Sequence, residues 1–125
     1  MSLDHMGLSV VDLANMKSFY EKVCAPLGLK VGYEAAGAAV GFGDGASFPC
    51  FFLMKSDTQQ RPRAHFAFRA KNRAAVDAFY KTAMELGAKD NGAPGIREHY
   101  HANYYGAFVI DPEGHNIEAV THAPE

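Results

Sequence analysis

The feature that most constrains the fold of this chain is an internal duplication. The chain reads HMGLSVVDLANMKSFYEKVCAPLGLKV from His5 and HFAFRAKNRAAVDAFYKTAMELGAKDN from His65. In both copies an aromatic pair follows the histidine at the same offset, Phe19-Tyr20 in the first and Phe79-Tyr80 in the second. A repeat of about 60 residues predicts two similar structural units, which build a continuous core only together.

Each copy predicts a short alternating strand, then a helix, then three further extended segments. Asp12 and Asn72 are typical N-caps for the two helices, and Gly28 and Gly87 stand where helices commonly end in a left-handed residue. The order of elements is therefore βαβββ twice, which is an α+β fold. The extended segments are expected near residues 29–34, 38–43 and 49–55 in the first copy, and near 88–91, 97–110 and 115–121 in the second.

A four-stranded sheet with one helix leaves its second face bare. Two such sheets can curl together, with the helices outside and a shared cavity within. We therefore expect one domain over residues 1–125, made of module one (1–57), a polar linker (56–63) and module two (64–125).

Composition excludes several classes of function. The net charge is −2, which gives no basic surface for nucleic acid. No apolar run approaches the roughly 20 residues of a membrane helix, and the N-terminus has no secretory signal pattern. Cys24 and Cys50 lack C-x-x-C spacing, which favours free thiols and a cytoplasmic location. We expect a small-molecule partner, with no nucleic acid and no membrane.

Strand alternation suggests where the two repeat histidines point. His5 and Ser9 share one face of the first strand, and His65 and Arg69 share one face of the corresponding strand in the second copy. The bulky apolar residues occupy the opposite faces, where a helix would cover them. The strand faces that carry His5 and His65 otherwise bear mostly small residues, such as Gly7 and Ala67, and these faces would border the cavity.

Glu118 lies in the middle of the last expected strand, where a carboxylate is costly unless it is paired or bound to a metal. If its neighbours Ile117 and Ala119 face the helix, Glu118 faces the cavity with His5 and His65. Two imidazoles and one carboxylate form a site for Fe(II), Mn(II), Ni(II) or Zn(II) with open positions for substrate oxygens. The alternative is that the two histidines are unrelated and that Glu118 is an edge residue.

The segment 97–105 is dense in protic side chains. It is interpreted as a substrate-contacting strand, with His101 as general acid or base, Tyr104 or Tyr105 as oxyanion donor, and Asn103 in the pocket. The alternative is an exposed aromatic strand or a dimer interface, where tyrosine is enriched. His115 is expected to be solvated or to support a ligand, and His122 to be inert.

The paired βαβββ units, the first-strand histidine in each, and the run DPEGHNIE at residues 111–118 resemble the vicinal oxygen chelate superfamily. This group includes glyoxalase I, extradiol dioxygenases, fosfomycin-modifying enzymes and bleomycin-resistance proteins. The resemblance covers essentially the whole chain. It implies an eight-stranded open barrel, a divalent metal ion held by His5, His65 and Glu118, and a homodimer.

Departures from the family patterns bear on the reaction. Glyoxalase I carries a fourth, acidic ligand, and alignment of the turns places that position at Phe51, which with Leu53 would instead form an apolar pocket wall. The catalytic tyrosine of extradiol dioxygenases falls on Phe108, and only Arg69 and Arg97 could serve the phosphonate of a fosfomycin substrate. The leading hypothesis is a lyase- or isomerase-like enzyme for substrates with adjacent oxygens, in which His101 or the Glu118 carboxylate moves the proton. An Fe(II) extradiol-type dioxygenase and a metal-free drug- or metabolite-binding protein remain alternatives.

Overall fold

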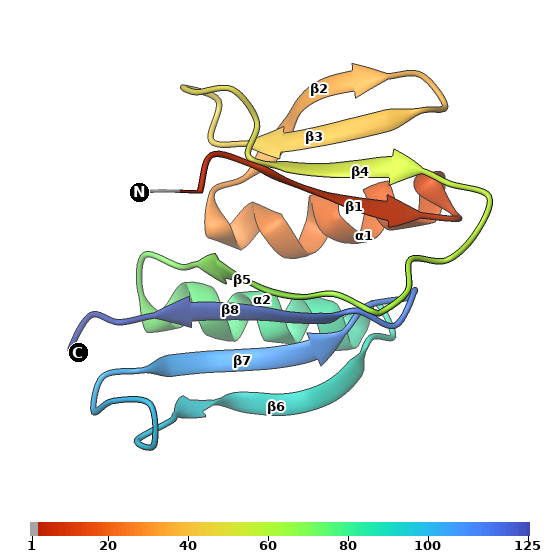
Figure 1. The fold of residues 1–125 in the computed structure, drawn as a ribbon. Helices are drawn as coiled ribbons and strands as arrows, with labels where there is room; N and C mark the ends of the chain where they lie inside the picture. Colours follow the sequence, from red (N-terminus) through yellow and green to blue (C-terminus); the bar gives the residue numbers. More distant parts are fainter. Residues whose placement is uncertain (1–2) are drawn as a thin grey trace. The chain divides into compact units, whose positions relative to one another are not determined.

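The computed structural model describes residues 3–125. The chain divides into two compact units, Met1–Pro62 and Arg63–Glu125, each of which is described by itself. Both units have the element order βαβββ, so the expected α+β fold of two repeated modules is confirmed (Figure 1).

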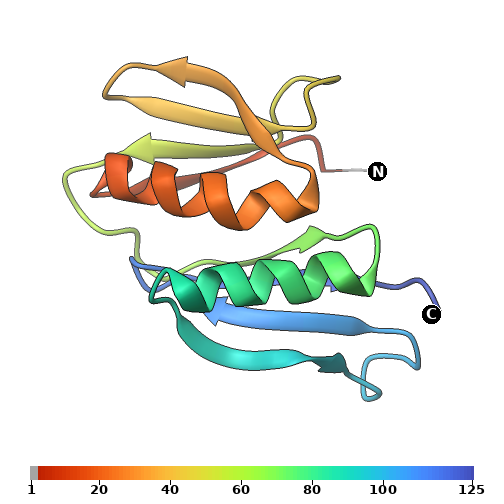
Figure 2. The same cartoon turned by 180° about the vertical axis from the view of Figure 1, so that it is seen from behind.

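Unit one is a four-stranded sheet with a helix on one face (Figures 1 and 2). The sheet order is β1-β4-β3-β2, in which β1 and β4 run parallel and the other pairs are antiparallel. The elements are β1 (Met6–Val10), α1 (Leu13–Cys24), a 3-10 turn (Ala25–Leu27), β2 (Lys30–Ala35), β3 (Ala39–Gly43) and β4 (Phe51–Lys55).

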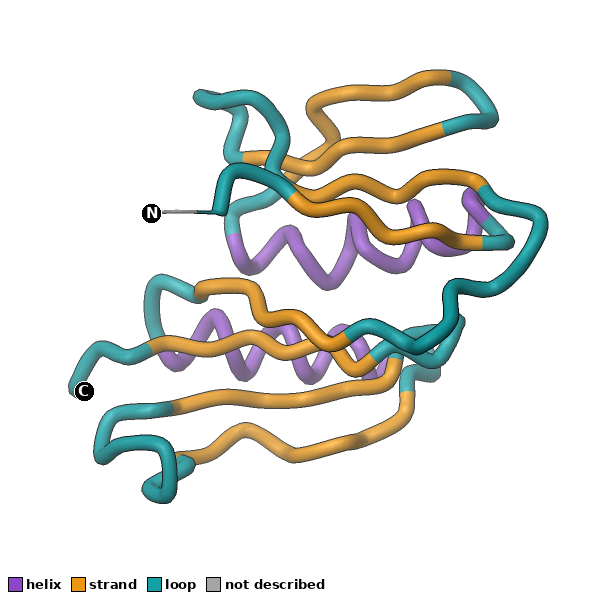
Figure 3. The backbone as a smooth tube through the Cα atoms, viewed as in Figure 1, coloured by secondary structure: helices purple, strands orange, loops and turns teal. Residues whose placement is uncertain are grey.

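Unit two repeats this arrangement, as the strand and helix colouring of Figure 3 shows. Its sheet order is β5-β8-β7-β6, with β5 and β8 parallel, and the helix α2 packs on β6, β7 and β8. The elements are β5 (His65–Arg69), α2 (Arg73–Glu85), β6 (Lys89–Ile96), β7 (Tyr105–Ile110) and β8 (Asn116–Thr121).

The helix ends form as the sequence predicts. The carboxylate of Asp12 accepts a hydrogen bond from the backbone N–H of Asn15, and the side chain of Asn72 caps α2 in the same way. Gly28 and Gly87 adopt φ of 81° and 85°, a left-handed conformation that side chains oppose. Among residues 3–125 no helix combines the length and apolar character needed to cross a bilayer.

The core of unit one corrects the expectation for Phe51 and Leu53. Both are fully buried among helix-facing residues, and the ring of Phe51 lies 5.0 Å from that of Tyr20 on α1. The intervening Phe52 and the following Met54 lie on the other face, above Gly41 and Gly7. Phe51 and Leu53 therefore belong to the packing of helix on sheet and do not line the histidine face.

The expected strand over 97–110 is also corrected. Only Tyr105–Ile110 forms β7, and the preceding strand β6 extends to Ile96, with a loop between them. Register shifts at Gly92 and Gly95 bend β6, and this edge strand contains Pro94. The segment expected near 88–91 marks the start of β6, and these interruptions hid its continuation to Ile96.

Candidate functional site

The open face of the unit-two sheet is the face away from α2, and it carries Glu118. In the strand register Glu118 pairs with Phe108 on β7 and with Ala67 on β5, while its neighbours Ile117 and Ala119 are buried toward the helix. His65 and Asn116 form the next pair along the same face. The alternation expected of β5 and β8 is therefore present, with His65 and Glu118 on one face.

His65 and Glu118 face each other across this sheet. The Nε2 atom of His65 is 3.6 Å from Oε1 of Glu118; the side chain of Glu118 is 3% exposed and that of His65 is 52% exposed. The other ring nitrogen of His65, Nδ1, donates a hydrogen bond to the backbone carbonyl of Asn116 at 2.9 Å. When the ring is neutral, its proton is on Nδ1 and Nε2 presents a lone pair toward the buried carboxylate.

This arrangement fits a cation. With a neutral His65 ring, the lone pairs of Nε2 and Oε1 repel each other, and a divalent ion between them would remove that repulsion; 3.6 Å is too long for a direct hydrogen bond. Two ligands of one divalent ion, each with a bond of about 2.1 Å, can be separated by this distance. Histidines that bind metals typically donate their second ring N–H to a carbonyl or a carboxylate, as His65 does.

The start of β5 is fixed by hydrogen bonds from the turn before β8. The Nδ1 atom of His115 accepts from the backbone N–H of Ala64 at 2.9 Å, and the N–H of Asn116 donates to the carbonyl of Ala64 at 3.0 Å. His115 is 1% exposed, so it is a buried brace rather than a solvated residue. The carboxylate of Asp111 closes the same turn by accepting from two backbone N–H groups. The brace holds the strand that orients His65.

The second oxygen of Glu118 is already occupied. The hydroxyl of Tyr104 donates a hydrogen bond to Oε2 of Glu118. Desolvation, followed by this hydrogen bond and the carboxylate charge, raises the pKa of Tyr104 well above its usual range. Gly106 provides the room, because a Cβ there would lie 3.2 Å from both Oε2 of Glu118 and a ring carbon of Tyr104.

His101 forms a pair with His122. The backbone N–H of Asn103 donates to Nδ1 of His101 at 3.0 Å, so the proton of the neutral ring is on Nε2. Nε2 then donates to Nδ1 of His122 at 2.8 Å. Both nitrogens of His101 are therefore engaged, and the free ring nitrogen of the pair is Nε2 of His122.

His122 was expected to be inert, but its Nδ1 is the hydrogen-bond partner of His101, and the sequence held a signal for its position. His122 follows Glu118 by four residues, so strand alternation places both on one face. The ring of Tyr104 lies between them, with its centroid 5.3 Å from that of His122. Asn103, which the sequence placed in the pocket, orients His101 through its backbone N–H. No contact within residues 3–125 places the Asn103 side chain near Glu118.

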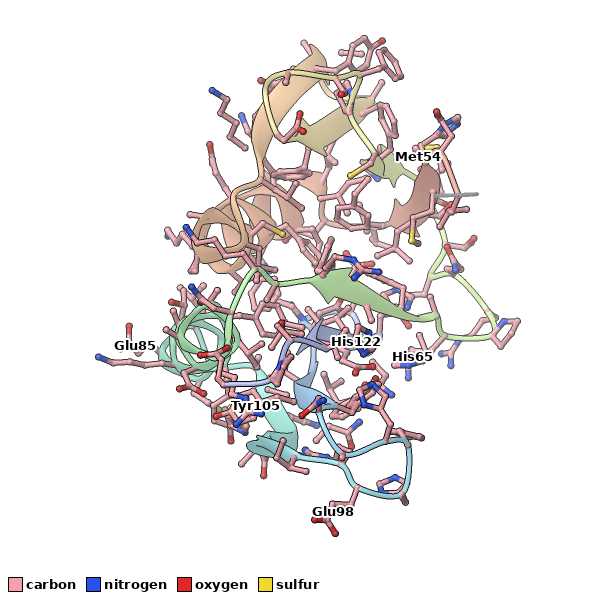
Figure 4. All side chains as sticks on the ribbon, turned by 90° about the vertical axis from the view of Figure 1, so that its left-hand side faces the viewer. Met54, His65, Glu85, Glu98, Tyr105 and His122 are labelled. Atoms are coloured by element: carbon pink, nitrogen blue, oxygen red, sulfur yellow. The ribbon has the colours of Figure 1, made fainter. Side chains whose placement is uncertain are left out.

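Tyr105 lies on the opposite face from Tyr104. Its hydroxyl donates to Asp77 of α2 at 2.6 Å, and Figure 4 shows it on the helix side of the sheet, away from His65. The hydrogen bond to Asp77, with desolvation and the Asp77 charge, raises the pKa of Tyr105 to about 12. Tyr105 therefore does not join the group around Glu118.

The remaining candidates of the two units have other partners or are exposed to solvent. Arg97 donates to the carbonyls of Gly95 and Ala93, and its guanidinium lies over the ring of Phe108. Arg69 is exposed at the end of β5. In unit one, the backbone N–H of Ser9 donates to the side chain of Gln60 at 3.0 Å. In the described part of the chain, Arg97, Arg69 and Ser9 therefore make no hydrogen bond or ion pair with His65 or Glu118.

In unit one, His5 resembles His65 in that its Nδ1 has an oxygen partner. Its Nδ1 lies 2.6 Å from a carboxylate oxygen of Asp4, which leaves Nε2 unengaged by that contact. The ring of His5 lies edge-on to Phe52 at 5.9 Å, and Tyr33 and Phe48 also contact Phe52. His5 thus borders an exposed aromatic group.

The two units can be superimposed position by position from their registers. Gly7 pairs with Phe52 as Ala67 pairs with Glu118, and these pairs lie two residues after His5 and His65. Phe52, not Phe51, is therefore the unit-one counterpart of Glu118. It is not an acid either, so unit one offers no fourth carboxylate at this position.

Within neither unit do three or more His, Cys, Asp or Glu side chains of residues 3–125 gather closely enough to hold a metal ion. Unit two supplies two ligands, His65 and Glu118, whose geometry fits a cation. A three-ligand site requires His5 from unit one, and that pairing stays a prediction.

Comparisons with known proteins agree with the fold. The chain is similar to a glyoxalase/bleomycin resistance protein from Albidiferax ferrireducens T118, at 23% identity over 98% of this chain and 100% of that chain, with a TM-score of 0.77. It is also similar to lactoylglutathione lyase from Agrobacterium tumefaciens, at 20% identity over 96% of this chain and 92% of the other, with a TM-score of 0.71. The fosfomycin resistance protein FosX from Mesorhizobium loti is 22% identical over 98% of this chain and 92% of its own, with a TM-score of 0.69.

At identities of 20–23% these solved structures show that the fold is shared, and they do not identify the reaction of this chain. A comparison with curated proteins found no match. The family profile described as the Glyoxalase/Bleomycin resistance protein/Dioxygenase superfamily matches residues 2–119, which is nearly the whole chain. The chain therefore belongs to the Glyoxalase/Bleomycin resistance protein/Dioxygenase superfamily.

Proposed function

We propose that the protein is a metal-dependent enzyme that acts on a small substrate with two adjacent oxygens, in a lyase- or isomerase-like reaction. The observation that carries this proposal is the pair formed by His65 and Glu118. The lone pair of His65 Nε2 faces a buried carboxylate at 3.6 Å, an arrangement that a divalent cation would stabilise.

The residues that would hold the ion are His65, Glu118 and His5. The bound ion would act as a Lewis acid that polarises substrate oxygens. The protein holds the two unit-two ligands in place through the Asn116 carbonyl and the Tyr104 hydroxyl. Burial of Glu118 keeps water from competing at its carboxylate.

Two groups are proposed to move the proton: the Glu118 carboxylate at the ion, and the His101–His122 pair for a substrate long enough to reach it. Because His101 donates to Nδ1 of His122, the neutral pair presents the Nε2–H of His122. Along an extended strand His122 lies about 13 Å from Glu118, at about 3.3 Å per residue. A substrate that reaches both must extend past Tyr104, which lies between them.

The aromatic group around Phe52 supports a substrate with an apolar body. Phe52 contacts His5, Tyr33 and Phe48, so a ligand bound at His5 would meet aromatic rings. Lactoylglutathione lyase from Agrobacterium tumefaciens and FosX from Mesorhizobium loti share the fold, which is compatible with several reactions on it. We also propose, from the family resemblance, a cytoplasmic homodimer, which light scattering of purified protein would test.

The test is metal analysis of tag-free protein together with three variants. We expect close to one ion per chain in the unmutated protein, and its loss in His65→Ala and in Glu118→Ala. His99→Ala is the matched control, since His99 contacts Tyr100 and neither proposed ligand. An unmutated protein that takes up no Zn(II), Ni(II), Mn(II) or Fe(II) would contradict the proposal and favour a metal-free binding protein.

Turnover assays then separate the reaction classes. We expect hemithioacetals to be converted with Ni(II) or Zn(II) bound. Oxygen consumption with catechols under Fe(II) would instead assign the extradiol-type dioxygenase reaction, and the lyase-like reaction would be wrong.

A further inference from the structure

Tyr104 reaches Glu118 from the loop that joins β6 and β7. Its hydroxyl donates to Oε2, while Oε1 of the same carboxylate lies 3.6 Å from His65 Nε2. The two oxygens of Glu118 therefore have different partners, one a phenol and the other the histidine proposed as a metal ligand.

The surroundings hold the Tyr104 side chain in this position. The backbone N–H of Arg97 donates to the carbonyl of Tyr104 at 2.8 Å, and the N–H of Tyr104 donates to the carbonyl of His101 at 3.2 Å. The rings of Tyr100 and His122 pack against the Tyr104 ring, with centroids 4.7 Å and 5.3 Å away. The absence of a side chain at Gly106 leaves space for the phenol beside Oε2.

We infer that Tyr104 is a positioning residue that restricts Glu118 to binding a cation through one oxygen. This inference rests on the proposed metal function and assigns Tyr104 a role other than contact with substrate. A phenol hydrogen bond to a carboxylate is charge-assisted, so it competes with bidentate metal binding. It also fixes the direction in which Oε1 points. Loss of such supporting hydrogen bonds typically lowers metal affinity by about 10- to 100-fold.

Tyr104→Phe removes the hydroxyl and keeps the ring. The matched control is Tyr105→Phe, which loses the same kind of hydroxyl–carboxylate bond, to Asp77, on the opposite face of the sheet. The first measurement uses metal-free protein in chelator and compares urea unfolding of Tyr104→Phe, Glu118→Leu and the double variant. We expect Tyr104→Phe to destabilise the protein when Glu118 is present and to have little effect in the Glu118→Leu background. The unfolding constant of the double variant should therefore differ roughly tenfold from the value expected if the two single effects were additive.

The second measurement uses Co(II) as the probe. We expect Tyr104→Phe to bind Co(II) about tenfold more weakly, because the direction of Oε1 is no longer fixed. The visible absorption spectrum of Co(II) should also change, because the carboxylate is then free to bind through both oxygens. Tyr105→Phe should match the unmutated protein in both readouts. Gly106→Ala should resemble Tyr104→Phe, because its Cβ would crowd the phenol and Oε2.

The outcomes separate this inference from the proposed function. Additive unfolding effects, or a Tyr104→Phe variant with unchanged Co(II) affinity and spectrum, would overturn the positioning role. Failure of the unmutated protein to bind Co(II) would overturn the proposed function. In that case non-additive unfolding would still support the pairing of Tyr104 with Glu118.

Discussion

Replacing Phe51 and Phe52 separately tests which face of β4 packs against α1. Phe51 is 1% exposed, and its ring lies 5.0 Å from Tyr20 and 5.9 Å from Phe42. A buried phenylalanine removes about 150 Å² or more from water, which at about 25 cal/mol per Å² corresponds to about 4 kcal/mol. Phe51→Ala should therefore lower the free energy of unfolding by about 3–5 kcal/mol, the range for such truncations in cores.

Phe52 is the matched control, because it is the adjacent residue with the same side chain. It lies on the other face of β4, half-buried above Gly41, so Phe52→Ala should cost only about 1 kcal/mol. The total stability of a domain is about 5–15 kcal/mol, so the difference between the two variants is large. Urea unfolding followed by circular dichroism measures the free energy of unfolding of both variants. In thermal unfolding, the midpoint temperature of Phe51→Ala should fall by about 12 °C or more. Equal losses, or a greater loss in Phe52→Ala, would refute the observed face assignment.

Three further predictions concern groups outside the His65–Glu118 pair. A thiol reagent should modify the exposed Cys50 in native protein and reach Cys24 only after unfolding, because burial raises the pKa of the Cys24 thiol; fast labelling of both thiols would contradict this. Tyr105 should ionise near its raised pKa of about 12, so its stabilising bond to Asp77 is fully present below about pH 10 and is lost as the pH rises through about 12. Ultraviolet titration should show this ionisation shifting down toward 10 in Asp77→Asn, and no shift would argue against the bond. His115→Ala should cost about 1–3 kcal/mol in urea unfolding by leaving a backbone N–H at the start of β5 without its acceptor, whereas a change near zero would mean that His115 is not a brace.

Most of the fold follows from local sequence signals. The repeat, the caps at Asp12 and Asn72, and the alternation around His65 and Glu118 are properties of short segments, and each is present in the structure. Only the start of β6 was predicted, near 88–91, because its glycines and Pro94 break the alternating pattern beyond that point and its strand character there depends on pairing with β7.

The errors at the site have two physical origins, a slip of one residue in unit one and a loop in unit two. Alignment of the turns at Asp44 and Asp111 placed the counterpart of Glu118 at Phe51, but the unit-one loop has one more residue before the equivalent position, Phe52. A slip of one residue moves a side chain to the opposite face of a strand. The bonds from Tyr104 and between His101 and His122 depend on the path of the 97–104 loop, which no periodicity in the sequence encodes.

The equivalence of Phe52 and Glu118 has a consequence for how such proteins diversify after duplication. Backbone hydrogen bonds between β1 and β4, and between β5 and β8, define these two equivalent positions. The side chain at either position can therefore change without altering the strand pairing. One half of the chain therefore carries an ionic group at this position and the other an aromatic one on the same backbone frame. A substitution at position 52 changes the chemistry of one half without a change in strand pairing.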